Sequence, residues 1–171
     1  MPITNHQSEQ ILRIARELKD IPGALIPILH GIQDELGYVP PDAVPLIANV
    51  LNLTRAEVYG VVTFYHDFRS EAPGRHIVRI CQAESCQATG SEALTAHAKK
   101  HLGIEFHQTT LDSNFTLEPV YCLGNCAGSP SVMIDQDVFG RVTPARLEVI
   151  LKEAQVEAPK ETNDESEEAK R

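Results

Sequence analysis

The sequence predicts an α+β fold, with a helical bundle at the N-terminus followed by a second domain of strands and helices. Apolar residues recur at helical spacing through about residues 5 to 70. Pro73-Gly74 is the clearest boundary signal. After it, short runs rich in β-branched residues alternate with helical patterns. We therefore expect a helical bundle at 1–72, a second domain at 73–156 and an acidic, disordered tail at 157–171.

Four helices are expected in the first domain, and their short connections favour a small bundle. Gly37 and Asn52 are placed to end the second and third helices in a left-handed conformation. Thr54-Arg-Ala-Glu57 has the form of a capping box and opens the fourth helix. The expected apolar positions are Ile11, Ile14, Ala15 and Leu18 in the first helix, and Leu25, Ile28, Leu29, Ile32 and Leu36 in the second.

The second domain is predicted to run strand, helix, strand, strand, strand, helix. His76–Cys81 fits a buried strand, and 115–121 is a second candidate that Pro119 restricts to an edge or to a strand that begins there. A hairpin is expected around Gln136-Asp137, and Thr143-Pro144 starts the last helix. The helix at 91–102 has Ala93, Leu94, Ala98 and Leu102 as its apolar set.

Composition excludes several classes of partner and location. The net charge of −9 opposes binding to nucleic acid or to an anionic membrane. No apolar run reaches the roughly 18 residues that span a bilayer, and the first residues lack the pattern of a signal peptide. We therefore expect a cytoplasmic protein without membrane insertion. In that reducing compartment, cysteines in close pairs indicate metal ligands more than disulfides.

All four cysteines lie in two short segments, Cys81-Gln-Ala-Glu-Ser-Cys86 and Cys122-Leu-Gly-Asn-Cys126, separated by 35 residues. Each segment directly follows a predicted strand. Two loops at the same end of a sheet converge even when they are distant in sequence. The pattern therefore predicts four sulfurs around one site at an edge of the second domain.

The spacing favours a [2Fe–2S] cluster, because such a cluster takes two ligands on each iron and each loop can serve one iron. Zinc sites prefer the tighter Cys-x2-Cys turn but do not require it. Spacing alone therefore leaves zinc, disulfides and free thiols open. Small residues in both loops would let backbone N–H groups approach the sulfurs. These residues are Ala83, Ser85, Ala88, Gly90, Gly124, Ala127, Gly128 and Ser129.

Cys-x4-Cys, 35 residues and Cys-x3-Cys together resemble the thioredoxin-like [2Fe–2S] ferredoxins. These include the E subunit of NADH–quinone oxidoreductase and its relatives in NAD-reducing hydrogenases and formate dehydrogenases. The resemblance continues in 25–40, 58–66 and 140–144 and covers about residues 10 to 154. It implies a thioredoxin-like second domain. It also implies that one [2Fe–2S] cluster is bound by Cys81, Cys86, Cys122 and Cys126.

Within the family, Cys81-Gln-Ala-Glu-Ser-Cys86-Gln-Ala and Phe64-Tyr-His-Asp-Phe-Arg69 look most like the gamma subunit of soluble NAD-dependent formate dehydrogenase. That resemblance implies a non-catalytic electron-transfer subunit with no active site of its own. Its direct partner would be a subunit that binds flavin and NAD. FMN, NAD and a molybdenum cofactor would lie only on partner subunits, the molybdenum on the catalytic one.

Alternatives remain within and outside this family. The chain would serve equally as the E subunit of NADH–quinone oxidoreductase or as its equivalent in an NAD-reducing hydrogenase. A different class is a zinc-stapled structural adaptor without a redox role. One departure from the family is Asp135-Gln136, where relatives often have Asn-Gly, and we expect a longer hairpin turn here.

Two histidines offer a further metal-binding pattern. His97 and His101 are spaced i, i+4 on one helix, which suits a shared metal ion. No carboxylate-bearing metal motif accompanies them, so the sequence favours solvated surface histidines.

Overall fold

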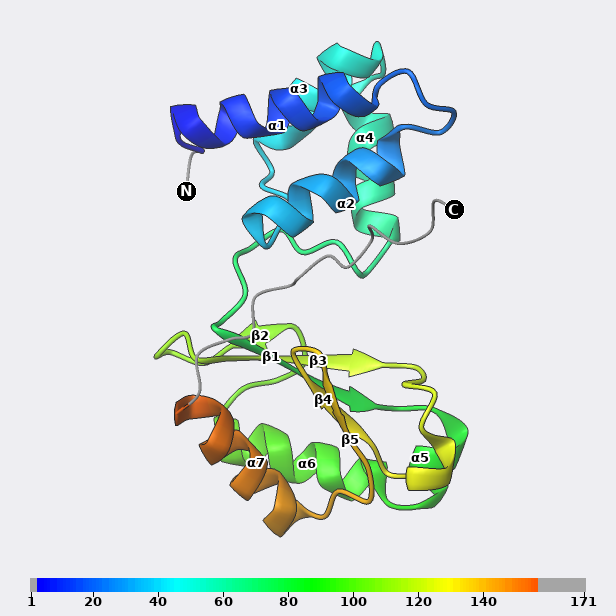
Figure 1. Cartoon of the computed structure of the whole chain (residues 1–171), viewed down its shortest axis with the longest axis vertical. Helices are drawn as coiled ribbons and strands as arrows, with labels where there is room; N and C mark the ends of the chain where they lie inside the picture. Colours follow the sequence, from blue (N-terminus) through cyan, green and yellow to red (C-terminus); the bar gives the residue numbers. More distant parts are fainter. Residues whose placement is uncertain (1–2, 157–171) are drawn as a thin grey trace, which may run out of the picture. The chain divides into compact units, whose positions relative to one another are not determined.

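The computed structural model describes residues 3–156 (Figure 1). The chain divides into two compact units, Met1–Pro73 and Gly74–Arg171. The tail expected at 157–171 lies outside the described residues. Among the helices of the described part, none has the length and apolar character that crossing a membrane requires.

The first unit consists of four helices whose ends are set by local sequence. Thr4 and Thr54 both form complete capping boxes, with Gln7 and Glu57 as their partners. Gly37 and Asn52 end α2 and α3 with φ values of 81° and 53°, so both predicted left-handed stops are confirmed. The helices are α1 (Asn5–Leu18), α2 (Leu25–Leu36), α3 (Ala43–Leu51) and α4 (Arg55–Phe64).

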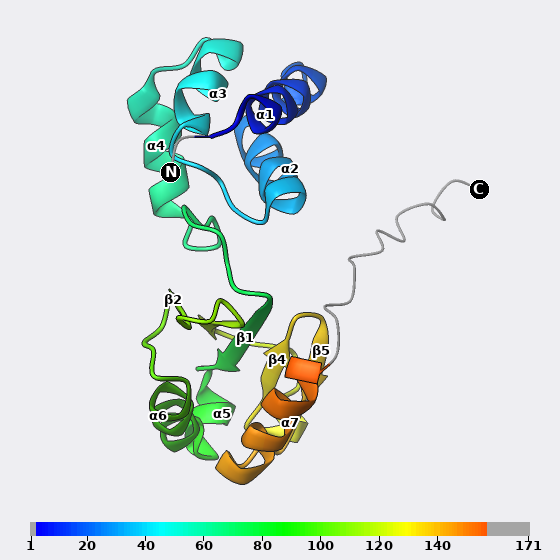
Figure 2. The ribbon, with the colours of Figure 1, turned by 90° about the vertical axis from the view of Figure 1, so that its left-hand side faces the viewer.

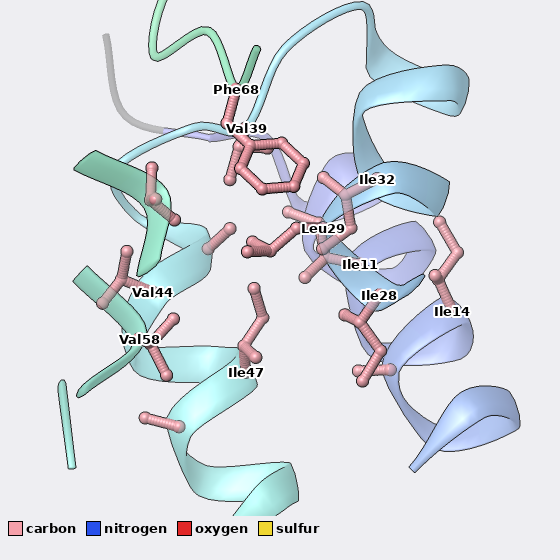
Figure 3. Close-up of a cluster of buried hydrophobic side chains, with 14 of the residues drawn as sticks. Ile11, Ile14, Ile28, Leu29, Ile32, Val39, Val44, Ile47, Val58 and Phe68 are labelled. Carbon is pink, nitrogen blue, oxygen red and sulfur yellow. The ribbon is translucent and has the colours of Figure 1, made fainter. Parts of the chain in front are cut away.

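The helices of this unit enclose one hydrophobic core. Figure 3 shows side chains from α1, α2, α3 and α4 pointing into a common centre, with the ring of Phe68 beside Val39. The predicted faces of α1 and α2 supply much of it, since Ile11, Ile28 and Ile32 are fully buried. The spacing of apolar residues was therefore a sound guide to this half of the chain.

The second unit contains a five-stranded sheet in the order β2-β3-β1-β4-β5. β1 runs parallel to β3, and every other neighbouring pair is antiparallel. Helices α6 and α7 both cover the same face of this sheet (Figures 1 and 2). The elements are β1 (His76–Cys81), α5 (Glu84–Ala88), α6 (Ser91–Leu102), β2 (Gln108–Thr109), β3 (Phe115–Val120), η1 (Cys126–Gly128), β4 (Val132–Ile134), β5 (Asp137–Phe139) and α7 (Pro144–Val156).

Short or polar features of this unit differ from the sequence prediction. The five-residue α5 and the two-residue β2 were not predicted, because neither is long enough to show a period. Pro119 lies inside an interior strand, which is tolerated because β2 pairs only with Thr116 and Leu117 and does not reach it. On α6, Ala93 is exposed and the polar Thr95 is buried in its place.

The predicted lengthening of the hairpin turn was wrong. Ile134 pairs with Asp137, so only Asp135 and Gln136 form the turn. Asp135 alone takes the left-handed conformation, at φ 53°. Its carboxylate accepts a hydrogen bond from the Ile77 amide at 2.9 Å and lies 2.7 Å from His76 Nδ1. These bonds to β1 hold a short turn without the expected Asn-Gly pair.

Candidate metal centre

The two cysteine segments leave the sheet at the same edge. Cys81 is the last residue of β1, and Cys122 follows β3 by two residues. Because the strands are parallel and Cys81 is in register with Val120, both carboxyl ends face the same way. The amide of Gln82 extends the pairing by donating to the Val120 carbonyl at 2.7 Å. The convergence predicted from the sequence is thus produced by one parallel pair of strands.

The first segment is buried and held by secondary structure. Cys81 and Cys86 are 2% and 3% exposed. Cys81 is fixed by β1, and its carbonyl accepts a hydrogen bond from the Ser91 hydroxyl at the start of α6. Cys86 lies on α5, and this helix places its side chain within hydrogen-bonding reach of Cys81 at the end of β1.

The second segment is exposed and held by close packing of a loop. Cys122 and Cys126 are both exposed. Gly124, at φ 73°, turns its amide toward Cys122 Sγ at 3.3 Å. A Cβ on Gly128 or on Gly140 would lie 2.7 Å from the Asn125 side chain. Because Gly128 and Gly140 have no side chain, there is room between them for the side-chain amide of Asn125, which supports this loop.

Serine hydroxyls connect the two segments. Ser85 Oγ donates to the Cys126 carbonyl at 3.2 Å and lies 2.8 Å from Ser129 Oγ. Ser129 in turn lies 3.5 Å from Cys86 Sγ and donates to the Cys126 carbonyl at 2.7 Å. Ser129 thus contacts the sulfur of one segment and the backbone of the other.

The environment of the sulfurs shifts their pKa values in opposite directions. Burial raises the pKa of Cys81, against hydrogen bonds from the backbone of Ala83 and Leu123. Burial also opposes ionisation of Cys86, but hydrogen bonds from Ser129, Cys81 and Ser131 outweigh it and lower the pKa of that thiol.

The exposed pair shows a third kind of perturbation. The hydrogen bond with Cys122, together with its charge and that of Cys86, raises the pKa of Cys126. Sulfurs of both segments therefore act on one another electrostatically, and the backbone N–H of Leu123 reaches Cys81 across the segments. Together with the serine hydrogen bonds between the segments, these interactions make the four thiols one candidate site.

This set of donors fits a [2Fe–2S] cluster. All four cysteines are free thiols, and two come from each segment. A binuclear iron cluster takes four thiolates, two on each iron, and its sulfurs accept hydrogen bonds from nearby N–H groups. Gly124 and Leu123 supply such groups.

Sequence reasoning missed the residues that support the cysteines. Ser129 was singled out only for its small size, although its hydroxyl joins the two segments. Asn125 and Gly140 were not identified as partners, because they lie 15 residues apart in the sequence. The run Gly128-Ser-Pro-Ser131, dense in small polar residues directly after a cysteine, was the available signal.

Comparisons with known proteins agree with this geometry. A family model described as thioredoxin-like [2Fe-2S] ferredoxin matches residues 11–155. The E subunit of NADH-quinone oxidoreductase from Pseudomonas aeruginosa is 41% identical over 134 residues, which cover 78% of this chain and 81% of the relative. The corresponding protein of Escherichia coli K12 is 36% identical over 146 residues, covering 85% of this chain and 88% of the relative.

A solved structure is similar in fold. A chain of an NAD+-reducing [NiFe]-hydrogenase in the H2-reduced state matches with a TM-score of 0.65 and 22% sequence identity. The match covers 79% of this chain but only 22% of the hydrogenase chain. At this identity the likeness concerns the fold alone.

Proposed function

The chain belongs to the thioredoxin-like [2Fe–2S] ferredoxin family, and we propose that it is an electron-transfer subunit of an NAD-linked oxidoreductase complex. One [2Fe–2S] cluster is the cofactor of this family. In this chain we assign its four ligands to Cys81, Cys86, Cys122 and Cys126. The zinc-stapled adaptor is set aside, because the chain belongs to a family defined by the iron–sulfur cofactor.

The observation that carries the proposal is the unequal exposure of the two cysteine pairs. A cluster with four thiolate ligands has no open position for a substrate, so its chemistry is the transfer of single electrons. Cys81 and Cys86 anchor one side in the protein interior, whereas Cys122 and Cys126 bring the other side to the surface. An exposed edge lets a partner approach closely enough to exchange electrons. We assign no catalytic residue to the chain.

The direct partner we propose is a subunit that binds flavin and NAD. The relatives named above are subunits of an oxidoreductase that acts on NADH, and this chain contains no G-x-G-x-x-G or P-loop motif of its own. Electrons would therefore pass between the cluster and a flavin held by another chain. We place the complex in the cytoplasm.

For the identity of the complex, we propose a soluble NAD-dependent formate dehydrogenase with a molybdenum-containing catalytic subunit. The support is the resemblance of Cys81-Gln-Ala-Glu-Ser-Cys86 and of 64–69 to the gamma subunits of those enzymes. The second candidate is NADH–quinone oxidoreductase, favoured by relatives that are 36% to 41% identical over most of their length.

Isolation of the native complex tests both levels of the proposal. The tagged chain is purified anaerobically from its own cells, and iron, sulfide, flavin and molybdenum are assayed. We expect two irons and two sulfides in the chain purified by itself, and a flavin subunit and formate-dependent reduction of NAD in the native complex. NADH–quinone activity without molybdenum would replace formate dehydrogenase by the second candidate. A colourless chain with one zinc would reject electron transfer.

We propose that the first unit provides part of the docking surface for the flavin subunit. Phe64 and Tyr65, at the end of α4, are 73% and 43% exposed, and their ring centroids are 5.0 Å apart. Tyr65 also packs edge-on against the buried Phe68, at 6.2 Å, which holds the pair in place. Rigid aromatic side chains of this kind are common anchors in protein interfaces.

A single substitution separates docking from cluster binding. Phe64→Asp should reduce recovery of the flavin subunit by tenfold or more while leaving two irons in the chain, because the cysteines belong to the other unit. Leu111→Asp is the matched control, since Leu111 is a fully exposed apolar side chain of the second unit. Unchanged recovery with Phe64→Asp would refute the docking role.

A further inference from the structure

A second group of metal-binding side chains lies on the helical face of the second unit. His97 and His101 project from α6, and Glu148 projects from α7. One donor atom from each of the three lies within 4.8 Å of the other two. Glu148 Oε1 is 3.0 Å from His97 Nε2 and 3.9 Å from His101 Nδ1. The two imidazole rings are stacked, with centroids 6.0 Å apart.

The structure thus supplies the carboxylate that the sequence pattern lacked. Glu148 follows His101 by 47 positions, so no local motif joins them. Helices α6 and α7 pack on one face of the sheet (Figure 1). This packing brings the three side chains together. Two imidazoles and one carboxylate form a donor set that is well known for zinc.

We propose that His97, His101 and Glu148 bind a divalent cation of the zinc class and thereby join α6 to α7. In a tetrahedral site with bonds of about 2.0–2.1 Å, neighbouring ligand atoms are about 3.3 Å apart. The separations of 3.0 and 3.9 Å from Glu148 bracket that value, and the two imidazole donors lie within 4.8 Å of each other, so side-chain rotations would bring the three donors onto one ion. Three protein ligands leave the fourth position to water.

The surroundings permit an ion to enter and stay. The three side chains are 31%, 35% and 38% exposed, so the site opens to solvent without being fully hydrated. His101 lies in the last turn of α6, where the helix dipole favours a cation. The ammonium of Lys99 is engaged elsewhere, 2.6 Å from Glu105 and 4.5 Å from the centroid of Phe106.

Zinc titration of the full-length, cluster-loaded protein tests this site. Calorimetry under anaerobic conditions should show one zinc bound with micromolar affinity, and the visible spectrum of the cluster should stay unchanged. Zinc-edge X-ray absorption should show only nitrogen and oxygen ligands, at about 2.0–2.1 Å, and no sulfur at about 2.3 Å. That readout distinguishes the new site from zinc at the cysteines and does not depend on electron transfer.

Variants assign the ligands. His97→Gln, His101→Gln and Glu148→Gln should each weaken zinc binding at least tenfold and abolish the rise in Tm that zinc causes in the unaltered protein. His107→Gln is the matched control, because His107 also pairs with a carboxylate, 2.6 Å from Glu118, but belongs to no group of three metal-binding side chains among the described residues. Sulfur ligation, affinity weaker than millimolar, or equal binding by the three variants and the unaltered protein would overturn the proposal.

Discussion

The two cysteine pairs belong to the same candidate site but are held in different ways. Cys81 and Cys86 are buried and are placed by a strand and a helix, whose backbone hydrogen bonds determine where the sulfurs lie. Cys122 and Cys126 are exposed and depend on a loop that packs around one side-chain amide. From this comparison we infer that the two pairs have different roles. The buried pair would retain the proposed cluster, and the exposed pair would present it to a partner.

The largest effect is expected when one sulfur is removed from each pair. Cys86→Ala and Cys126→Ala should both purify without the cluster, because one iron would lose one of its two thiolates. The cluster-free proteins should then differ. Only Cys86→Ala should lose stability, by about 1 kcal/mol, because it removes a buried sulfur from a packed site. Iron assays and urea unfolding measure the two effects, and equal unfolding midpoints would remove the distinction between the pairs.

The next effect concerns the loop that holds the exposed pair. In Gly140→Ala, the new Cβ would lie 2.7 Å from Asn125 Nδ2 and 2.8 Å from the Gly128 carbonyl oxygen. The loop must move, and we expect iron content to fall to less than half while the first unit keeps its helical structure. Gly60→Ala is the control, because its added Cβ would meet nothing within 4 Å beyond its chain neighbours and the backbone of its own helix, and it should raise stability by about 0.5–1 kcal/mol. Full iron content in Gly140→Ala would show that the loop is not tightly constrained.

A smaller effect should appear in the reduction potential. In the free thiol, Cys86 Sγ donates to Ser129 Oγ at 3.5 Å. A thiolate bound to iron carries no proton, so the Ser129 hydroxyl would donate to that sulfur instead of to the Cys126 carbonyl. A hydrogen bond to a ligand sulfur stabilises the reduced, more negative cluster. Ser129→Ala should lower the potential by about 40 mV, which is about 1 kcal/mol for one electron. Thr89→Ala is the control, since its hydroxyl bonds the Cys86 carbonyl and not the sulfur. A redox titration followed by EPR distinguishes them, and an equal shift in both variants would contradict the role of Ser129.

The smallest effect is a difference in ionisation after the cluster has been removed. Because the pKa of Cys86 is lowered, its contribution to stability is present above the ordinary thiol pKa and is lost as pH falls through the lowered value. The raised pKa of Cys126 has the opposite sign, so its contribution is present at lower pH and is lost as pH rises through the raised value. A pH titration followed by thiolate absorption near 240 nm measures this difference. An ionisation at lower pH should appear in Cys126→Ala, which retains Cys86, and should be absent in Cys86→Ala.

Features with a period or a strong local signal were predictable from the sequence. The capping box at Thr54, the left-handed stops at Gly37 and Asn52, and the strand ending at Cys81 all appeared where the sequence predicted them. The short elements α5 and β2 carry no period. The hairpin turn at Asp135 was mispredicted because its stability comes from bonds to β1, which no local pattern reveals.

The candidate sites divide in the same way. The cysteines could be identified from the sequence because the two members of each pair lie within five residues of each other. Ser129, Asn125 and Gly140 act through contacts between loops that fold together only in three dimensions. Glu148 could not be predicted as a partner of His97 and His101, because it is distant from them in the sequence and approaches them only in the folded chain.

The parallel pairing of β1 with β3 has a consequence for the order of events during synthesis of the protein. Cys86 leaves the ribosome 40 residues before Cys126, which at about 5–20 residues per second is a delay of about 2–8 s. Until β3 and Cys122 have been synthesised, late in that interval, the nascent chain offers two thiols and no strand against which β1 can form its parallel ladder. Two thiols cannot hold two irons. If the four cysteines are the ligands, iron and sulfide are therefore delivered only after both segments have been synthesised, which makes maturation of the site a late event in the synthesis of this chain.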